Sequence, residues 1–182
     1  MPQIARQIRP MEEYDLDDVL SIGHGGTRGW GRRDFQKAMR VPGVLCRVID
    51  DCVIGRELTG GDRAIVMVGY LVFGVGARRV DLVQLAVASF ARRRGFGRRM
   101  IEYVRARLAS GPLEAVTRIQ AHVTESNLPA QCFLRACDFT AVSLKRGFFE
   151  PTDTDEPAVM FQWCKSGPPP APIDWRSRWR RA

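Results

Sequence analysis

The sequence predicts an α+β fold in which a mixed central sheet of about seven strands is flanked by about four helices. Three observations lead to this fold class. Apolar strands over residues 44–51, 64–75 and 82–88 follow one another with short loops between them, which favours an antiparallel meander. The last of these strands leads through a glycine-bearing loop into a helix. The whole order, β-α-α-β-β-β-α-β-α-β-β, lacks the regular alternation of a doubly wound sheet and contains no internal repeat.

The N-terminal segment supplies one strand and two helices. Residues 4–9 alternate isoleucine with polar side chains, as a half-buried strand does. Residues 12–22 carry an apolar stripe at helical spacing, with acidic residues in the first turns. Residues 23–31 contain five glycines in nine positions and are predicted to form a loop. Asp34 is the candidate N-cap of a short second helix that carries Phe35, Ala38 and Met39.

The C-terminal half continues with strands and helices. A helix of about three turns is predicted to open at Gly97 and to end before Gly111 and Pro112. Residues 116–123 alternate apolar and polar side chains as a strand does, and residues 129–136 form the next helix. Residues 141–146 and 159–164 then pair as a closing hairpin around a long loop.

The strand, glycine-bearing loop and helix between Asp81 and Leu108 carry the clearest chemical signal. The first turn of a helix has free N–H groups and the positive end of a dipole, so this layout binds anions. Gly95 and Gly97 allow the backbone to come close to a bulky anion. Positive charge is added by Arg92, Arg93, Arg94, Arg98 and Arg99. Phosphate or pyrophosphate is the natural ligand, although an ordinary turn beside a solvated arginine face has the same pattern.

Two familiar phosphate motifs do not fit this segment. A Walker loop requires Gly-Lys-Ser/Thr where this sequence has Arg98 and Arg99. A dinucleotide fingerprint requires a third glycine within a repeated βαβ pattern, which is missing here.

The pattern Arg92-x-x-Gly95-x-Gly97 resembles the Gln/Arg-x-x-Gly-x-Gly/Ala signature of the GCN5-related N-acetyltransferase (GNAT) superfamily. The ungapped run from Leu85 to Gly97 is similar to the RimI-like N-terminal (ribosomal-protein) acetyltransferases in particular. The resemblance implies the acyl-CoA N-acyltransferase (GNAT) fold, with loop N–H groups on the pyrophosphate of acetyl-CoA and the preceding strand along its pantetheine arm. On this basis the cosubstrate is expected at Leu85, Ala86, Val87, Arg92, Arg93, Arg94, Gly95, Phe96, Gly97, Arg98 and Asn127.

His122 is the preferred candidate base. It ends a strand at a position where RimI-like enzymes commonly carry Glu and where some eukaryotic relatives carry a His that orders a proton-relaying water. An ordinary histidine pKa of about 6.5 suits an α-amine, whose pKa of about 7.7–8.0 leaves it partly neutral at pH 7. Glu125 is the rival base. The alternative for His122 is a strand-end histidine that only makes a hydrogen bond.

The acceptor site matches the family less closely. Trp30, together with Phe35, corresponds to a Trp and a Phe that often line the acceptor site, and Phe148 and Phe149 stand where the family often has a tyrosine pair. Leu134 stands where many members have the tyrosine that protonates the thiolate, so this sequence lacks that acid. Asn127 would also serve as a helix N-cap. The acids Glu150, Asp153, Asp155 and Glu156 either attract a cationic amine or are simply solvated, and His24 is expected to be a solvent-exposed loop residue.

Composition narrows the class of protein. No apolar run approaches the roughly 20 residues of a membrane span, and the N-terminus has no signal-peptide core. The five cysteines have no CxxC or Cys/His spacing, so we expect reduced thiols, a cytoplasmic location and no metal site. The net charge of +8 is concentrated in the arginine loop and in the tail, and we expect no nucleic-acid partner.

The sequence therefore predicts an acetyltransferase domain at residues 1–165, followed by a Pro-rich linker and a basic Trp/Arg tail at residues 166–182. The predicted reaction moves acetyl from acetyl-CoA directly to a primary amine, the N-terminal α-amine of a protein or peptide such as a ribosomal protein. The enzyme is expected to be a monomer or a homodimer. The alternatives are acetylation of a small amine, such as a polyamine or an antibiotic-like compound, and a non-catalytic module that binds CoA, the ribosome or RNA.

Overall fold

The computed structural model describes residues 7–23, 30–54, 63–109, 113, 115–149, 156–168 and 170–173, the side chains of 52–54 and 63–64 excepted. Several predicted features lie outside the described residues. They are the start of the first strand, most of the loop 23–31 with His24, most of the connection between the strands predicted at 44–51 and 64–75, Gly111 and Pro112, the acids Glu150, Asp153 and Asp155, and the tail from residue 174.

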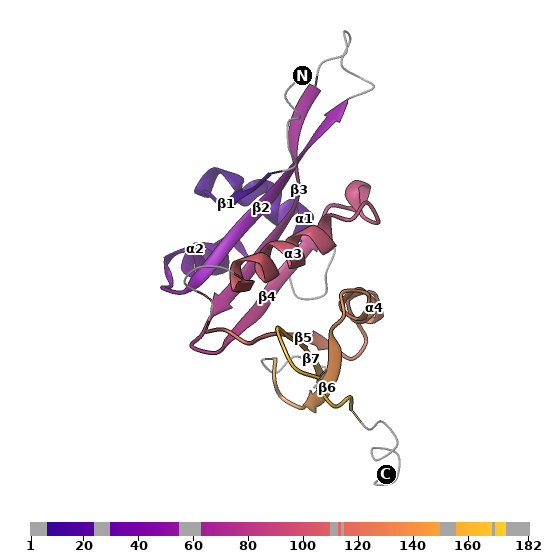
Figure 1. Ribbon diagram of the computed structural model, residues 1–182. Helices are drawn as coiled ribbons and strands as arrows, with labels where there is room; N and C mark the ends of the chain where they lie inside the picture. The colour runs from indigo at the N-terminus through magenta and orange to yellow at the C-terminus, as the bar shows by residue number, and fades with distance from the viewer. Residues whose placement is uncertain are drawn as a thin grey trace. The chain divides into compact units, whose positions relative to one another are not determined.

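The described residues form seven strands and four α-helices, so the predicted fold class is confirmed (Figure 1). The strands are β1 (Ile8–Pro10), β2 (Val44–Ile54), β3 (Arg63–Val75), β4 (Arg79–Val87), β5 (Arg118–Thr124), β6 (Thr140–Lys145) and β7 (Ala158–Cys164). The helices are α1 (Leu16–Gly23), α2 (Arg32–Arg40), α3 (Phe96–Ala109) and α4 (Leu128–Ala136), with short 3₁₀ helices η1 (Glu13–Asp15) and η2 (Ser89–Ala91).

The sheet is mixed, and its hydrogen-bonding order is β1-β2-β3-β4-β5-β7-β6. β1 pairs antiparallel with β2, and β2 pairs antiparallel with β3. β4 and β5 pair in parallel, while β7 lies antiparallel between β5 and β6. The chain forms two compact units, Met1–Val75 with Val83–Ala106 and Gly76–Leu82 with Arg107–Ala182.

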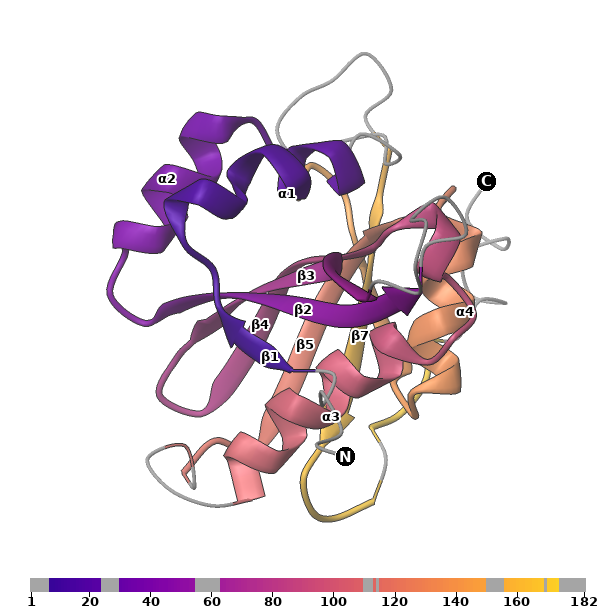
Figure 2. The same ribbon diagram turned by 90° about the horizontal axis from the view of Figure 1, so that it is seen from above.

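In the first unit, helices cover both faces of the strands. Figure 2 shows α1 and α2 on one side of β2 and β3 and α3 on the other. Tyr70 and its neighbour Gly69 on β3 show why. Tyr70 belongs to the core cluster that includes Leu16 and Phe35, whereas a Cβ at Gly69 would lie 3.3 Å from Met100 Cε of α3. Because side chains alternate along a strand, one strand serves both layers.

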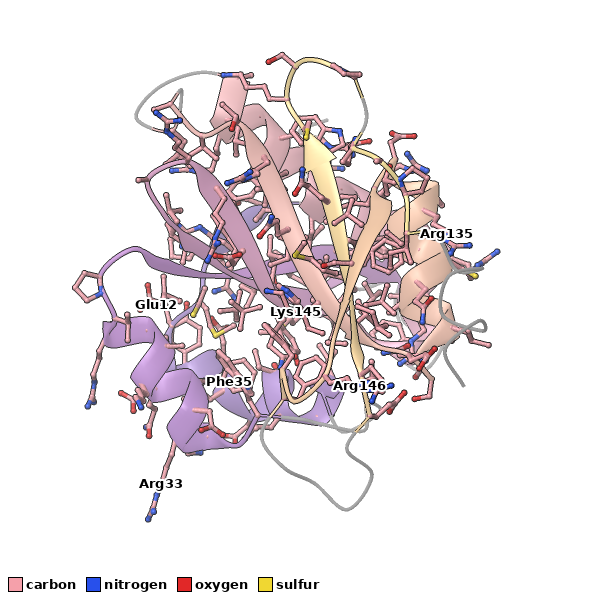
Figure 3. The ribbon with its side chains drawn as sticks, turned by 90° about the horizontal axis from the view of Figure 1, so that it is seen from below. Glu12, Arg33, Phe35, Arg135, Lys145 and Arg146 are labelled. Atoms are coloured by element: carbon pink, nitrogen blue, oxygen red, sulfur yellow. The ribbon has the colours of Figure 1, made fainter. Side chains whose placement is uncertain are left out.

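Helix α2 begins earlier than predicted. Its N-cap is Gly31, and Asp34 lies in the first turn, where its Oδ2 accepts a hydrogen bond from the Gly31 N–H at 2.8 Å. The prediction of Asp34 as the N-cap was therefore wrong, since its carboxylate bonds back to the cap from the third helical position. Figure 3 shows the amphipathic result, with Phe35 pointing towards the strands and Arg33 pointing away.

In the second unit, the two faces of β5 and β7 differ in character. Gln120 and His122 of β5 pair with Gln162 and Met160 of β7, and directly paired residues face the same side. The intervening residues, which face the other side, are fully or nearly fully buried: Ile119, Ala121, Val159 and Phe161. His122 therefore lies on the face that carries Gln120, Gln162 and Met160, opposite the fully apolar face.

Element ends differ from the predictions by a few residues. β2 continues to Ile54, and β4 begins at Arg79. Helix α3 begins at Phe96, one residue before Gly97. None of these shifts changes the order of the elements, and the predicted hairpin of residues 141–146 and 159–164 is present as β6 and β7.

Candidate functional site

The loop between β4 and α3 folds back on the end of β4. The Ala88 N–H donates to the Val68 carbonyl at 2.9 Å, and the Arg92 N–H donates to the Ser89 carbonyl at 3.3 Å. Arg92 also donates from Nε to the Val87 carbonyl at 3.1 Å. The bond between Arg92 and Val87 holds the loop beside the end of β4, where Leu85, Ala86 and Val87 are half-buried.

Left-handed backbone occurs twice in this loop, at Arg93 with φ 64° and at Gly95 with φ 86°. At Gly95 a Cβ would meet nothing within 4 Å, so the backbone conformation is the reason for glycine there. Arg93 has no such freedom and carries strain of about 1 kcal/mol. Gly97 lies in the first turn of α3, where backbone N–H groups have no acceptor within the helix. Loops of this kind form concave sites that bind anions.

The charges around the loop fit a polyanion such as acetyl-CoA. The arginines Arg92, Arg93, Arg94, Arg98 and Arg99 are all exposed, whereas Phe96 and Gly97 are buried. Arg94 is distinct because its Nη2 lies 3.3 Å from Oδ2 of Asp51 and its guanidinium lies over the Phe96 ring, 5.5 Å from the centroid. The predicted cosubstrate contacts in this unit are thus brought together.

In the second unit, His122 is stacked face to face on Phe148. The ring centroids are 3.8 Å apart and the planes differ by 13°. Phe149 packs edge-on against Phe148 at 5.1 Å, and the Lys145 ammonium lies 5.4 Å from the Phe148 centroid. Lys145 is the last residue of β6, and Figure 3 labels it and the next residue, Arg146. The candidate base and the aromatic pair, which are far apart in the sequence, therefore form one cluster.

Burial lowers the pKa of His122 to about 4, with further lowering by Lys145 and Arg79 and an opposing effect of Asp81. The imidazole is neutral at pH 7 and is a weaker base than the ordinary value of about 6.5 suggests. Its Nε2 is buried and has no hydrogen-bond partner among the described residues. Leaving a buried polar nitrogen without a hydrogen-bond partner costs free energy, which makes this position unusual in the described part of the chain.

Glu125 and Asn127 lie in the turn after β5. The Gln131 side chain donates to the carbonyls of Thr124 and Glu125, at 3.3 and 2.7 Å, and ties α4 to this turn. Asn127 caps α4, since its Oδ1 accepts a hydrogen bond from the Ala130 N–H at 3.2 Å. The predicted capping role of Asn127 is confirmed. The Ser126 N–H donates to the Glu156 carboxylate, so this acid of the hairpin loop has a structural partner.

Leu134 is 4% exposed on α4, so its position supplies neither a hydroxyl nor contact with solvent.

In the first unit, Trp30 packs edge-on against Phe35 at 5.3 Å, and Phe35 packs against Tyr70 at 5.4 Å. Trp30 is thereby fixed to the core. Sequence reasoning missed Lys145 and Asp51, because a lysine at a strand end and an acid in a strand carry no local signal of their partners.

Among the described residues, no helix is long and apolar enough to cross a membrane. That part of the chain also contains no group of three or more His, Cys, Asp or Glu side chains arranged to hold a metal ion. Cys46, Cys132, Cys137 and Cys164 are free.

Residues 39–139 match the model of the acetyltransferase (GNAT) family, and this match spans 101 of the 182 residues. The chain belongs to the GNAT family. The protein is accordingly an acetyltransferase that uses acetyl-CoA as its cosubstrate. The comparison with curated proteins gives no match.

Solved GNAT structures share the fold. The ribosomal-protein-S18-alanine N-acetyltransferase from Escherichia coli is 19% identical, with a TM-score of 0.67 over 90% of this chain and 96% of its own. Arabidopsis thaliana NAA60 in complex with acetyl-CoA is 17% identical, with a TM-score of 0.71 over 90% of this chain and 100% of its own. A spermidine N-acetyltransferase chimera from Vibrio cholerae and hSSAT is 15% identical, with a TM-score of 0.63 over 87% and 96%.

Proposed function

We propose that residues 1–165 form a domain that acetylates the N-termini of proteins or peptides. It transfers acetyl from acetyl-CoA directly to the α-amine, with His122 as the proton acceptor. The amine nitrogen attacks the thioester carbonyl and forms the C–N bond. Its proton passes to the His122 imidazole, directly or through a water molecule. The C–S bond then breaks, and the products are an acetylated amine and CoA.

The state of His122 is the observation that carries the choice of an α-amine. With a pKa of about 4, the imidazole cannot remove a proton from an ammonium group before attack, so the amine has to arrive neutral. At pH 7 roughly one α-amine in seven is neutral, compared with about one lysine amine in 2,500. A base as weak as His122 therefore favours an α-amine over a lysine side chain or a polyamine as the acceptor.

The same low pKa provides a route for the departing thiolate. An imidazolium with a pKa of about 4 is a strong enough acid to protonate a thiolate whose parent pKa is about 8.5. The enzyme then does not require a tyrosine at Leu134. Water is the other source of this proton.

The remaining roles are those that the resemblance to the family implies for these residues. The N–H groups of Gly95 and Gly97 and the neighbouring arginines would hold the pyrophosphate, and backbone N–H groups of Leu85, Ala86 and Val87 would polarise the thioester. Phe148, Phe149 and Trp30 would contact the acceptor. Glu125 is the second candidate base. Asn127 would contact the pantetheine arm in addition to capping α4.

The fold neighbours include enzymes for both kinds of acceptor. One is named for an alanine of ribosomal protein S18, and another is named for spermidine. We infer a protein or ribosomal-protein N-terminus as the acceptor, and a cytoplasmic location in which the free thiols stay reduced.

Two peptides of one sequence test the choice of amine. The first has a free α-amine and an acetylated lysine, and the second has an acetylated α-amine and a free lysine. We expect CoA release with the first peptide and none with the second or with spermidine. Release with spermidine or the free lysine, and none with the free α-amine, would contradict the proposal.

A further inference from the structure

A buried carboxylate on β2 reaches the cosubstrate loop. Asp51 is 7% exposed, and its Oδ2 lies 3.3 Å from Arg94 Nη2. A register shift between Ile49 and Asp50 marks a β-bulge just before it, and such bulges re-aim side chains. Asp50 pairs instead with Arg9, at 2.7 Å from Nε. Two adjacent acids thus hold two different arginines, one on β1 and one in the loop.

Arg94 is fixed from two directions. Its guanidinium bonds to Asp51 and lies over the buried ring of Phe96, the first residue of α3. Its two chain neighbours, Arg93 and Gly95, are the residues with left-handed backbone. A side chain anchored at this point ties the strained turn to the strand below it, which helps to keep a conformation that costs free energy by itself.

We propose that Asp51 is a positioning residue for the cosubstrate loop, because its ion pair with Arg94 holds the Arg93–Gly95 turn in the anion-binding conformation before acetyl-CoA arrives. This inference rests on the assignment of the loop to the pyrophosphate.

Positioning and simple electrostatics predict opposite results. A carboxylate beside a polyanion repels it, so removing the charge of Asp51 would strengthen acetyl-CoA binding if charge alone mattered. If the carboxylate holds the loop, removing it loosens the turn and weakens binding, since part of the binding free energy then goes into ordering it. For one partly exposed ion pair we expect roughly a two- to fivefold increase in Kd.

The test is calorimetric titration of the purified full-length protein with acetyl-CoA. Asp51→Asn keeps the shape of the side chain and removes its charge, and Asp50→Asn is the matched control with the same change one residue away. We expect weaker binding for Asp51→Asn only, and partial recovery in Asp51→Glu. At saturating acetyl-CoA, kcat and the KM for the acceptor should stay unchanged, which a general structural defect would not allow.

A double-mutant cycle with Arg94→Met shows whether the pair acts as a unit. Methionine keeps packing on Phe96 and cannot pair with Asp51. If the proposal holds, Asp51→Asn adds little to the effect of Arg94→Met. Additive effects, or unchanged or tighter binding in a folded Asp51→Asn protein, would overturn it. If Asp51→Asn fails to fold, Arg94→Met and Asp51→Glu carry the same comparison.

The outcome is separable from the proposed function. Acetyl-CoA binding that is insensitive to Asp51 removes this inference and leaves α-amine acetylation standing. A wild-type protein that does not bind acetyl-CoA removes the loop assignment, and this inference with it.

Discussion

Replacing Phe148 by alanine should raise the pKa of His122. The aromatic ring lies 3.8 Å from the imidazole centroid and withholds it from water, and burial is the largest cause of the lowered pKa. Without the stack, water reaches the ring and stabilises its charged form. The charged groups that also act on His122 are Lys145 on β6 and Arg79 and Asp81 on β4, and none of them is substituted in this variant.

The expected size follows from the starting and limiting values. His122 has a pKa of about 4 in the wild type, and an exposed histidine has about 6.5. Removal of one covering ring should recover roughly one pKa unit, because the strand neighbours and Lys145 remain. At pH 5.5 the wild-type ring is then about 3% protonated, and the variant ring is about 25% protonated.

The pH dependence of folding stability provides a second test of the lowered pKa of His122. The folded pKa lies below the unfolded value of about 6.5, so between pH 6.5 and 4 the unfolded chain binds more protons than the folded chain. The contribution of His122 is therefore fully present above pH 6.5 and is lost as the pH falls towards 4. In Phe148→Ala the folded pKa is higher, so the pH range over which this contribution is lost should end at a higher pH than in the wild type.

Imidazole NMR signals measure the pKa directly. The chain has two histidines, so a His24→Gln background leaves His122 as the one to be followed between pH 3.5 and 8. Lys145→Gln serves as the control, and its midpoint should rise by less than that of Phe148→Ala. A wild-type midpoint near 6.5, or an unchanged midpoint in Phe148→Ala, would refute the reasoning.

Substitutions at three further positions test the loop and the helix cap. Gly97→Glu should abolish acetyl-CoA binding in calorimetry, because it places a negative charge where the pyrophosphate is expected. Gly97→Ala is the control that adds a smaller side chain without charge. Unchanged acetyl-CoA affinity in a folded Gly97→Glu protein would contradict the loop assignment. Arg93→Gly should raise the free energy of unfolding, measured with urea, by up to about 1 kcal/mol, because glycine adopts a φ of 64° without strain. A clear decrease in the free energy of unfolding would argue against backbone strain at Arg93. Asn127→Ala should lower the free energy of unfolding by about 1 kcal/mol, because the Ala130 N–H loses its hydrogen-bond partner. Asn127→Asp should keep most of that stability, because its carboxylate can accept the same hydrogen bond.

Local signals gave the correct prediction where one segment decides its own structure. The change from a strand pattern to a helical pattern around Gly95 and Gly97 placed β4, the loop and α3 to within a few residues. The cap at Asn127 was likewise predictable, because an asparagine before a proline-bearing first turn is a local arrangement.

Features that depend on distant partners were not predictable in this way. The insertion of β7 between β5 and β6 is decided by strand pairing across the sheet, which the hairpin pattern alone does not reveal. The pKa of His122 depends on a ring from the β6–β7 segment, so an ordinary value was the only one the sequence could supply. Asp51 gave no sign of its role, because its partner comes from the loop before α3.

The measurement that tests the central claim most directly is the position of the acetyl group in the product. The protein would be mixed with acetyl-CoA and a panel of peptides that have both a free α-amine and a free lysine, together with spermidine, and the acetylated atom would be located by mass spectrometry. The account predicts acetyl on the α-amine of the peptides, lost in His122→Ala while acetyl-CoA binding persists. Acetyl only on lysine or spermidine nitrogen, or undiminished transfer by His122→Ala, would contradict it.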